Sequence, residues 1–278
     1  GRPGTTFYRS SEEEQEESDM LKAYIKAENL KHTHTVTAKL FWLVPLFAIV
    51  IPVFLSIQNA GYYYQMNQFN WSYTTFYPML LLLSAAFAVQ REKKLKNRVI
   101  SALPIDLNKV WAAKAAYILK TLAVSAIIIY AAEETISRIF AAGGSRTISG
   151  PAGFEAVLLW IILILWQIPL WLFVFHILGF AAGMILGLAG NIALGVLGAL
   201  SKWWLLNPFT YINRLMCPVL KILPNNLPAV PESQTYFEGV LNPNVIPRGI
   251  VASLLLFIVL YILTAKWYQR KEETGWEN

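Results

Sequence analysis

The chain has 278 residues, of which 56% are hydrophobic, 14% aromatic and only 14% charged. Soluble domains carry about 25% charged residues, so this composition excludes an ordinary soluble globule and a disordered chain. It also argues against a nucleic-acid-binding protein, although the formal net charge is +6. The single cysteine, Cys217, excludes an intrachain disulfide framework and a cysteine-based metal cluster. A chain of this length can hold several membrane spans.

Residues 1–19 form an acidic, polar lead-in that differs from the rest of the chain. They contain six Asp or Glu residues and only two Arg residues, so residues 20–278 are more basic than the whole. We interpret residues 1–19 as an artificial remnant or a disordered tail, Met20 as the native start, and 20–278 as one transmembrane domain. The first apolar run is long for a signal peptide and no A-x-A site follows it, so we expect no cleavage there.

The next segment, residues 20–38, is polar enough to lie outside the bilayer. Its apolar and polar residues fall on different sides of a helix, with Leu21, Tyr24, Ile25 and Leu30 near one face and Lys22, Lys26 and Asn29 on another. This pattern predicts an amphipathic helix that lies on the anionic inner leaflet. A solvated cytoplasmic helix remains the alternative.

Six apolar stretches approach the roughly 20 residues that a helix needs to cross a bilayer. They run over about 40–57, 72–90, 110–132, 154–177, 178–200 and 249–265. The run over 154–200 is too long for one span, and Gly179 predicts a reversal near 176–180. We therefore predict an all-α polytopic membrane protein with six transmembrane helices.

Lysine and arginine set the orientation of these spans. Thirteen of them lie on one side, at Lys22, Lys26, Lys31, Lys39, Arg91, Lys93, Lys94, Lys96, Arg98, Lys109, Lys266, Arg270 and Lys271. The other side has six, four of them in the long loop 201–248. Both termini and the loop 91–109 are therefore predicted to be cytoplasmic. Aromatic residues are expected to form an outer belt, at Tyr62, Tyr63, Tyr64, Trp71, Tyr73, Tyr77, Trp203 and Trp204.

The loop between the second and third spans carries the most informative pattern. Six charged residues lie within 91–98, and Leu95, Val99 and Leu103 recur at every fourth position. Pro104 ends this stretch, and Asp106 can cap the next helix. The pattern predicts a short cytoplasmic helix that transmits force from a cytoplasmic partner to two spans; a merely solvated loop is the alternative.

The same loop carries a resemblance to a known family. The chain resembles permease subunits of ABC transporters of the ABC-2 type, and within them the lantibiotic-immunity branch. The matching residues are Glu92-Lys93-Lys94, Asn97-Arg98, Leu103-Pro104-Ile105, Leu107, Lys109, Trp111 and Ala113-Lys114, followed later by Leu206–Tyr211 and Asn213–Met216. The resemblance extends over residues 20–278. The glycine usual in the ABC-2 loop is not clearly present, so the turn there is expected to differ.

This resemblance implies a six-helix half-channel with an amphipathic N-terminal elbow helix. Such a subunit pairs with a second, non-identical permease subunit and docks on cytoplasmic ABC ATPase subunits through the loop helix. The immunity branch expels lantibiotics, which are cyclised cationic peptides, from the bacterial cytoplasmic membrane. The residues expected to couple to the ATPase are Glu92, Lys93, Leu95, Lys96, Arg98, Val99 and Leu103. The chain has no G-x-x-x-x-G-K-(S/T) phosphate loop, so ATP and Mg²⁺ are expected in the partner, with no cofactor bound directly.

Polar residues within the spans and the outer loop provide further candidates. Lys120, Gln167 and Asn191 are candidates for a substrate path, although Lys120 could instead extend toward the inner interface. Glycines at small-x-x-x-small spacing in the fifth span predict either a subunit interface or tight internal packing. The apolar stretch 214–223 predicts a re-entrant or interfacial helix over the exit. The residues expected there are Pro208, Tyr211, Arg214 and Leu215.

An enzyme is the alternative that the sequence disfavours. Glu133, Glu134 and Arg138 fit E-E-x-x-x-R, the first motif of the intramembrane CAAX-protease-like family. Only His176 follows it, and with His32 and His34 no metal or acid–base set converges. We therefore predict that the chain is not itself an enzyme. A non-transporting sensor, a peptide-sequestering immunity protein, or a permease for another lipid-like or antibiotic cargo remain open.

Overall fold

The computed structural model describes residues 5–33, 35–57, 63–94, 106–140 and 147–274, and these are helical apart from turns and one isolated bridge between Ile222 and Pro228. The helices are α1 (Thr5–His32), α2 (Val36–Ile57), α3 (Tyr64–Trp71), α4 (Tyr77–Lys94), α6 (Leu107–Phe140), α7 (Gly150–Ile164), α8 (Gln167–Leu188), α9 (Gly195–Gly198), α10 (Tyr211–Leu220) and α11 (Val245–Thr274). Two π-helical segments, η1 (Ser72–Phe76) and η2 (Ala189–Leu194), and two 3₁₀ turns, η3 (Trp204–Leu206) and η4 (Pro208–Thr210), complete them.

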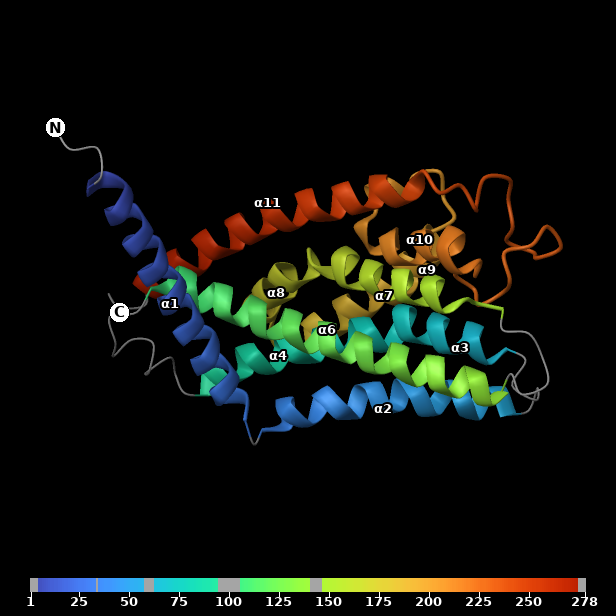
Figure 1. The fold of residues 1–278 in the computed structure, drawn as a ribbon, viewed down its shortest axis with the longest axis horizontal. Helices are drawn as coiled ribbons and strands as arrows, with labels where there is room; N and C mark the ends of the chain where they lie inside the picture. The colour runs from blue at the N-terminus through green and yellow to red at the C-terminus, as the bar shows by residue number, and fades with distance from the viewer. Residues whose placement is uncertain (1–4, 34, 58–62, 95–105, 141–146, 275–278) are drawn as a thin grey trace.

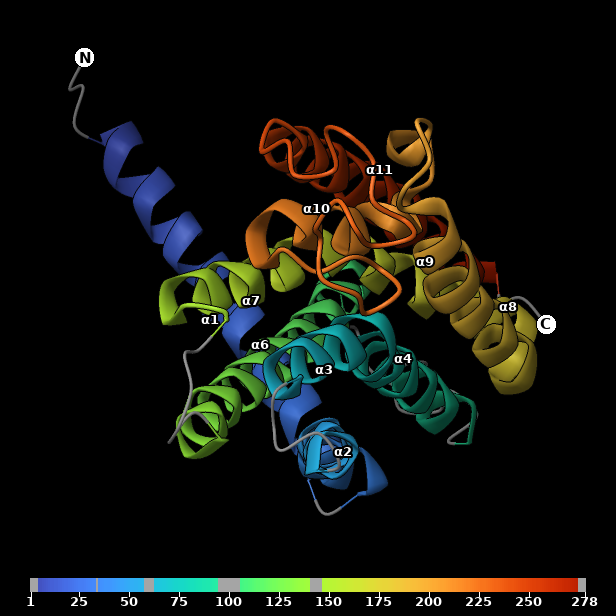
Figure 2. The same ribbon diagram turned by 90° about the vertical axis from the view of Figure 1, so that its right-hand side faces the viewer.

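Five helices are long and apolar enough to cross a membrane. They are Ala38–Ile57, Tyr64–Glu92, Leu107–Phe140, Gln167–Gly198 and Val245–Lys271, and α7 is a shorter apolar helix. The architecture is that of a multi-pass membrane protein. The long helices run along the same axis between two ends of the molecule (Figure 1). We call the end at which α4 ends, α6 begins and α11 ends the basic end, and the opposite end, which carries residues 199–244, the loop end (viewed in Figure 2).

Helix α8 reverses its direction at Gly179. This residue has φ 78° and ψ −174°, a conformation that glycine adopts far more readily than residues with a Cβ. Gln167 hydrogen-bonds to Asn191, and the ring of Phe175 packs on Gly183. Both pairs are symmetric about Gly179, so residues before and after it form antiparallel arms. The reversal predicted near 176–180 is therefore confirmed.

The first arm is itself interrupted, which differs from the single helix predicted over 154–177. Helix α7 ends at Ile164, and α8 begins at Gln167. Pro169 has no N–H to donate to the carbonyl of Leu165, so the α-helical hydrogen-bond ladder is broken at this point.

The second arm carries the glycine stripe, and the stripe packs inside the chain. A Cβ on Gly183 would lie 2.4 Å from Phe175, and one on Gly187 would lie 2.3 Å from Leu82. A Cβ on Gly190 would lie 2.8 Å from the ring of Phe209, and one on Gly195 would lie 2.9 Å from its carbonyl oxygen. These contacts favour the tight-packing interpretation of the small-x-x-x-small pattern.

The span Tyr64–Glu92 is the most enclosed of the five, and it begins earlier than the predicted 72–90. Its first turns contain buried amide side chains that find partners inside the bundle, such as Gln68 with the carbonyl oxygen of Ala48 at 2.9 Å. Tyr64, Tyr73 and Tyr77 are buried, so the prediction that they belong to an outer aromatic belt is wrong. Tyr73 and Tyr77 instead pack against the ring of Trp160.

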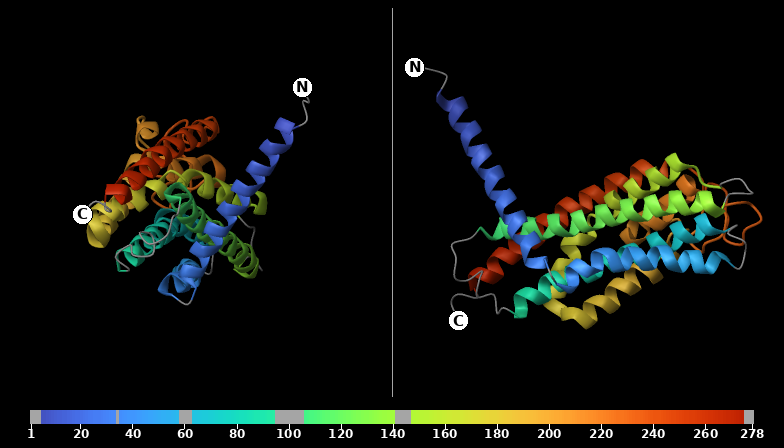
Figure 3. Two further views of the ribbon diagram at one scale, coloured as in Figure 1. Left: turned by 90° about the vertical axis from the view of Figure 1, so that its left-hand side faces the viewer. Right: turned by 60° about the horizontal axis from the view of Figure 1, so that its bottom comes forward.

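Helix α1 crosses the long helices at the basic end (Figure 1 and Figure 3). It begins at Thr5, so the acidic lead-in continues the helix where the composition predicted a disordered tail. Glutamate, glutamine and lysine favour the helix, and Asp19 pairs with Lys22 one turn later at 2.9 Å. The buried face also differs from the predicted one, because Glu28 is buried whereas Leu30 is 63% exposed.

A cap of turns and the short helix α10 covers the loop end. The helix runs over Tyr211–Leu220, close to the predicted 214–223, and ends where Lys221 adopts a left-handed conformation. It is almost wholly buried within the cap and against α7 and α11.

Candidate functional site

Buried charged groups meet at the basic end, where α1, α4, α6, α8 and α11 come together. Glu92 of α4 pairs with Lys114 of α6. The other carboxylate oxygen of Glu92 lies 3.7 Å from Nε2 of His176 in α8 and 3.5 Å from Oη of Tyr268 in α11. Together with Glu28 of α1 we call these residues the charge cluster. The side chain of Lys114 has no exposed surface, so the cluster is enclosed by protein.

Aromatic rings shield the cluster from water. Trp111 lies one turn before Lys114 on α6, and its ring centroid is 4.9 Å from that of Tyr268 and 5.9 Å from that of His176. The ammonium group of Lys114 also lies 5.8 Å from the centroid of the Tyr268 ring. Because an isolated charge in such surroundings is strongly destabilising, the arrangement requires both partners of the pair.

Helix α1 joins the cluster through Glu28. Its carboxylate accepts from Nζ of Lys31 at 2.8 Å and lies 3.3 Å from Nε2 of His32, whose ring stacks on Tyr117 of α6 at 4.0 Å. Burial alone would raise the pKa of the Glu28 carboxyl, but Lys114, His32 and Lys31 hold that pKa well below its usual range. Glu28 is therefore ionised at neutral pH and ties α1 to α6.

The cluster lies where the chain leaves α4 and where it enters α6. Glu92 lies in the last turn of α4, and Lys114 lies two turns into α6, 22 residues later. One ion pair thus joins the helix that enters the 95–105 connection to the helix that leaves it. No group of three or more metal-ligating side chains occurs in the part of the chain that the structure describes.

The predicted coupling residues fall in two groups. Leu95, Lys96, Arg98, Val99 and Leu103 lie outside the described residues, and Lys93 lies in the last turn of α4. Glu92 is buried and points to Lys114, whereas we expected it to contact an ATPase. Sequence reasoning missed Lys114 as its partner, although a lysine within an apolar helical run was the available signal.

The predicted substrate-path residues make hydrogen bonds inside the chain. Gln167 and Asn191 exchange two hydrogen bonds, of 2.8 and 2.9 Å, and Trp171 Nε1 donates to Gln167 Oε1 at 2.8 Å. This network fastens the two arms around Gly179. Lys120 reaches Oδ1 of Asn29 in α1.

The predicted exit residues hold the cap together. Arg214 donates to the carbonyl oxygen of Val240 at 2.6 Å, and Tyr211 donates to that of Leu205 at 2.9 Å. Leu215 is fully buried, and Pro208 begins the turn η4.

A groove of about 280 Å³ opens at the loop end between the two π-helices. We call it the outer groove; it is lined by Asn70, Trp71, Thr74, Thr75, Ile192, Val196, Pro224, Asn225 and Asn226. Segments of π-helix are rare and often lie at functional sites. The mixture of amide, hydroxyl and apolar groups suits an amphipathic ligand.

The E-E-x-x-x-R motif does not form a site with His32 or His176, the histidines that the structure describes. Glu133 accepts a hydrogen bond from Gln65 at 2.8 Å near the loop end, and Arg138 pairs with Glu134. His176 belongs to the charge cluster beside Lys114, and Lys114 precedes Glu133 on α6 by about 28 Å of helix rise.

Comparison with known proteins assigns no family, because no protein-family model, no curated protein and no solved structure matches the chain.

Proposed function

We propose that the chain is a permease subunit of an ABC exporter of the ABC-2 type, which expels a lantibiotic or a similar amphipathic peptide from a bacterial membrane. The observation that carries this proposal is the Glu92–Lys114 pair. The pair joins α4 to α6 at the two ends of the 95–105 connection. His176, Tyr268 and Glu28 interact with it from three further helices. A partner that displaces the connection would therefore displace five helices together.

The proposed topology has six crossings, with the arms on either side of Gly179 counted separately. The basic end then faces the cytoplasm, in agreement with the excess of lysine and arginine there. Partner ATPase subunits would bind at this end and supply ATP and Mg²⁺, and a second, non-identical permease subunit would complete the channel. The outer groove would contact the cargo on the opposite side, with Thr75 and Asn225 facing its polar groups and Trp71 its apolar groups.

The decisive experiment reconstitutes the chain with its partner ATPase and measures stimulated ATP hydrolysis and peptide release from proteoliposomes. Lys96→Glu combined with Arg98→Glu should abolish stimulation, because both charges lie in the connection that the ATPase would grip. Arg138→Glu, an exposed charge near the loop end, is the matched control and should retain it. Membrane insertion should be the same in both variants.

Two results would contradict the proposal. Unchanged stimulation in the double variant would remove the connection from the coupling pathway. Peptide binding by the chain without any associated ATPase would favour the sequestering or sensor alternative.

A further inference from the structure

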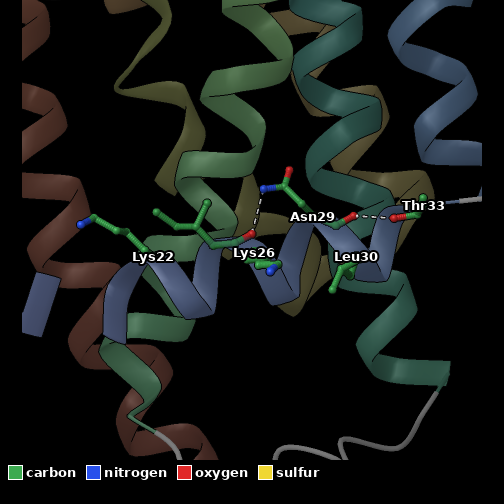
Figure 4. A pocket seen from close by; sticks show the side chains of 6 residues that line it. Lys22, Lys26, Asn29, Leu30 and Thr33 are labelled. Atoms are coloured by element: carbon green, nitrogen blue, oxygen red, sulfur yellow. Dashed lines mark hydrogen bonds between the residues drawn. The ribbon is translucent and has the colours of Figure 1, made fainter. Parts of the chain in front are cut away.

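The outward face of α1 carries a second, shallow groove, of about 330 Å³. It is lined by Lys22, Ile25, Lys26, Asn29, Leu30 and Thr33. Their spacing of three and four residues places them along one face of the helix, as Figure 4 shows. Glu28 and His32 occupy the adjoining face, which is buried toward α6. We call the lined surface the α1 groove.

The α1 groove is positively charged. Two lysines and no acidic residue line it, and Lys120 of α6 adds a third ammonium group where it reaches Oδ1 of Asn29. Glu28, on the adjoining face, is buried and is compensated by Lys31 and Lys114. Asp19 pairs with Lys22, but both side chains are largely exposed to solvent, where such pairs are weak.

Apolar surface begins directly beside these charges. Along α6, Val124 and Ile127 follow Lys120 on the same helix face, and Ile127 is 55% exposed. The distance from Lys120 to Ile127 along the helix is about 10 Å. Within the groove itself, Leu30 is 63% exposed. The groove therefore lies where a helix surface that would face lipid chains meets a cluster of ammonium groups.

We propose that the α1 groove binds the headgroup of an anionic phospholipid from the leaflet at the basic end. Lys22 and Lys26 would neutralise the phosphate, and the acyl chains would follow Val124 and Ile127 along α6. The exposed leucine and the adjoining apolar strip favour a lipid, whose headgroup and acyl chains would contact both surfaces, over a free phosphate or an acidic peptide, which would contact the ammonium groups alone. This inference requires membrane insertion but does not require transport.

The test measures binding of fluorescent phosphatidylglycerol to the purified chain in neutral-detergent micelles, with phosphatidylcholine as the neutral comparison. Lys22→Gln combined with Lys26→Gln should weaken phosphatidylglycerol binding by about 25-fold, since each juxtamembrane lysine contributes about fivefold. Lys202→Gln, which removes an exposed lysine at the loop end, should leave binding unchanged. Leu30→Ser should also weaken binding of the lipid and should not affect binding of glycerol phosphate.

Three outcomes would overturn the proposal. These are full binding by a correctly folded double variant, equal binding of phosphatidylcholine, and equally strong competition by soluble glycerol phosphate. If the double variant fails to fold, Lys26→Gln and Leu30→Ser each provide the test separately. Because the partner ATPase is absent from the assay, its result is independent of the proposed export function.

Discussion

Replacing Lys114 with methionine should strongly destabilise the protein. Lys114 has no exposed side-chain surface and Glu92 has only 10%, so the substitution leaves a carboxylate in the bundle without its ammonium partner. Removing one member of a buried pair costs about 3–5 kcal/mol. Tyr268 at 3.5 Å and His176 at 3.7 Å are too distant to replace the lost hydrogen bond.

Restoring neutrality should recover most of this loss. In the double variant Glu92→Gln with Lys114→Met no buried charge of the pair remains, and such replacements are often close to neutral. The measurement is reversible unfolding of the purified protein in mixed micelles, analysed as a double-mutant cycle. The control is Arg138→Met on the same helix, whose pair with Glu134 at 2.7 Å is exposed and should be worth less than about 1 kcal/mol.

The reasoning would be refuted if Lys114→Met lowered the unfolding free energy no more than Arg138→Met. It would also fail if the double variant lost as much as the sum of the two single variants, because the pair would then contribute no coupling energy.

Three further predictions concern other parts of the bundle. Gly183→Ala should lower the free energy of unfolding by about 1–3 kcal/mol, and with it the thermal midpoint, because the added Cβ would lie 2.4 Å from the buried ring of Phe175. An unchanged midpoint would show that the ring moves aside without cost. Glu28→Gln should be destabilising at neutral pH. Because the fold depresses the pKa of Glu28, its ionised carboxylate stabilises the protein above the ordinary pKa of 4.5, and this stabilisation is lost as the pH falls below 4.5. The difference in unfolding free energy between the variant and the unsubstituted protein should therefore narrow in acid. A difference that stays constant with pH would contradict the role of ionised Glu28. Asn191→Leu should lower the unfolding free energy by about 1–3 kcal/mol, because it removes the hydrogen-bond partner of Gln167. If the variant instead lost peptide release without losing stability, the result would favour a role of these residues in a substrate path.

The sequence predicted the features that depend on one stretch of chain at a time. Apolar runs located the long helices, because spanning length and composition are local properties. Gly179 predicted the reversal, because a break in a bulky run is visible without knowing its neighbours. The short helix before the last span was likewise expected from its prolines and apolar residues.

Features that depend on a partner in another helix were not predicted. Glu92 lies among five basic residues in the sequence and looks solvated, and its burial follows only from Lys114 approaching on α6. Tyr73 and Tyr77 are residue types that are typical of an interfacial belt, but both are buried and pack against the ring of Trp160. Gln68 looks too polar for a span until the carbonyl oxygen of Ala48 supplies its acceptor.

If the two arms around Gly179 pivoted at this single-residue turn, a small displacement near the turn would become larger farther along the arms. His176, which faces Glu92, lies three residues from the turn, about 4.5 Å along the helix. Segment η2, which borders the outer groove, lies 10 to 15 residues beyond the turn, or about 15–22 Å away. A displacement of about one ångström imposed at His176 would thus become about three to five times larger at the far wall of the groove if the arms rotated about Gly179 as one stiff body.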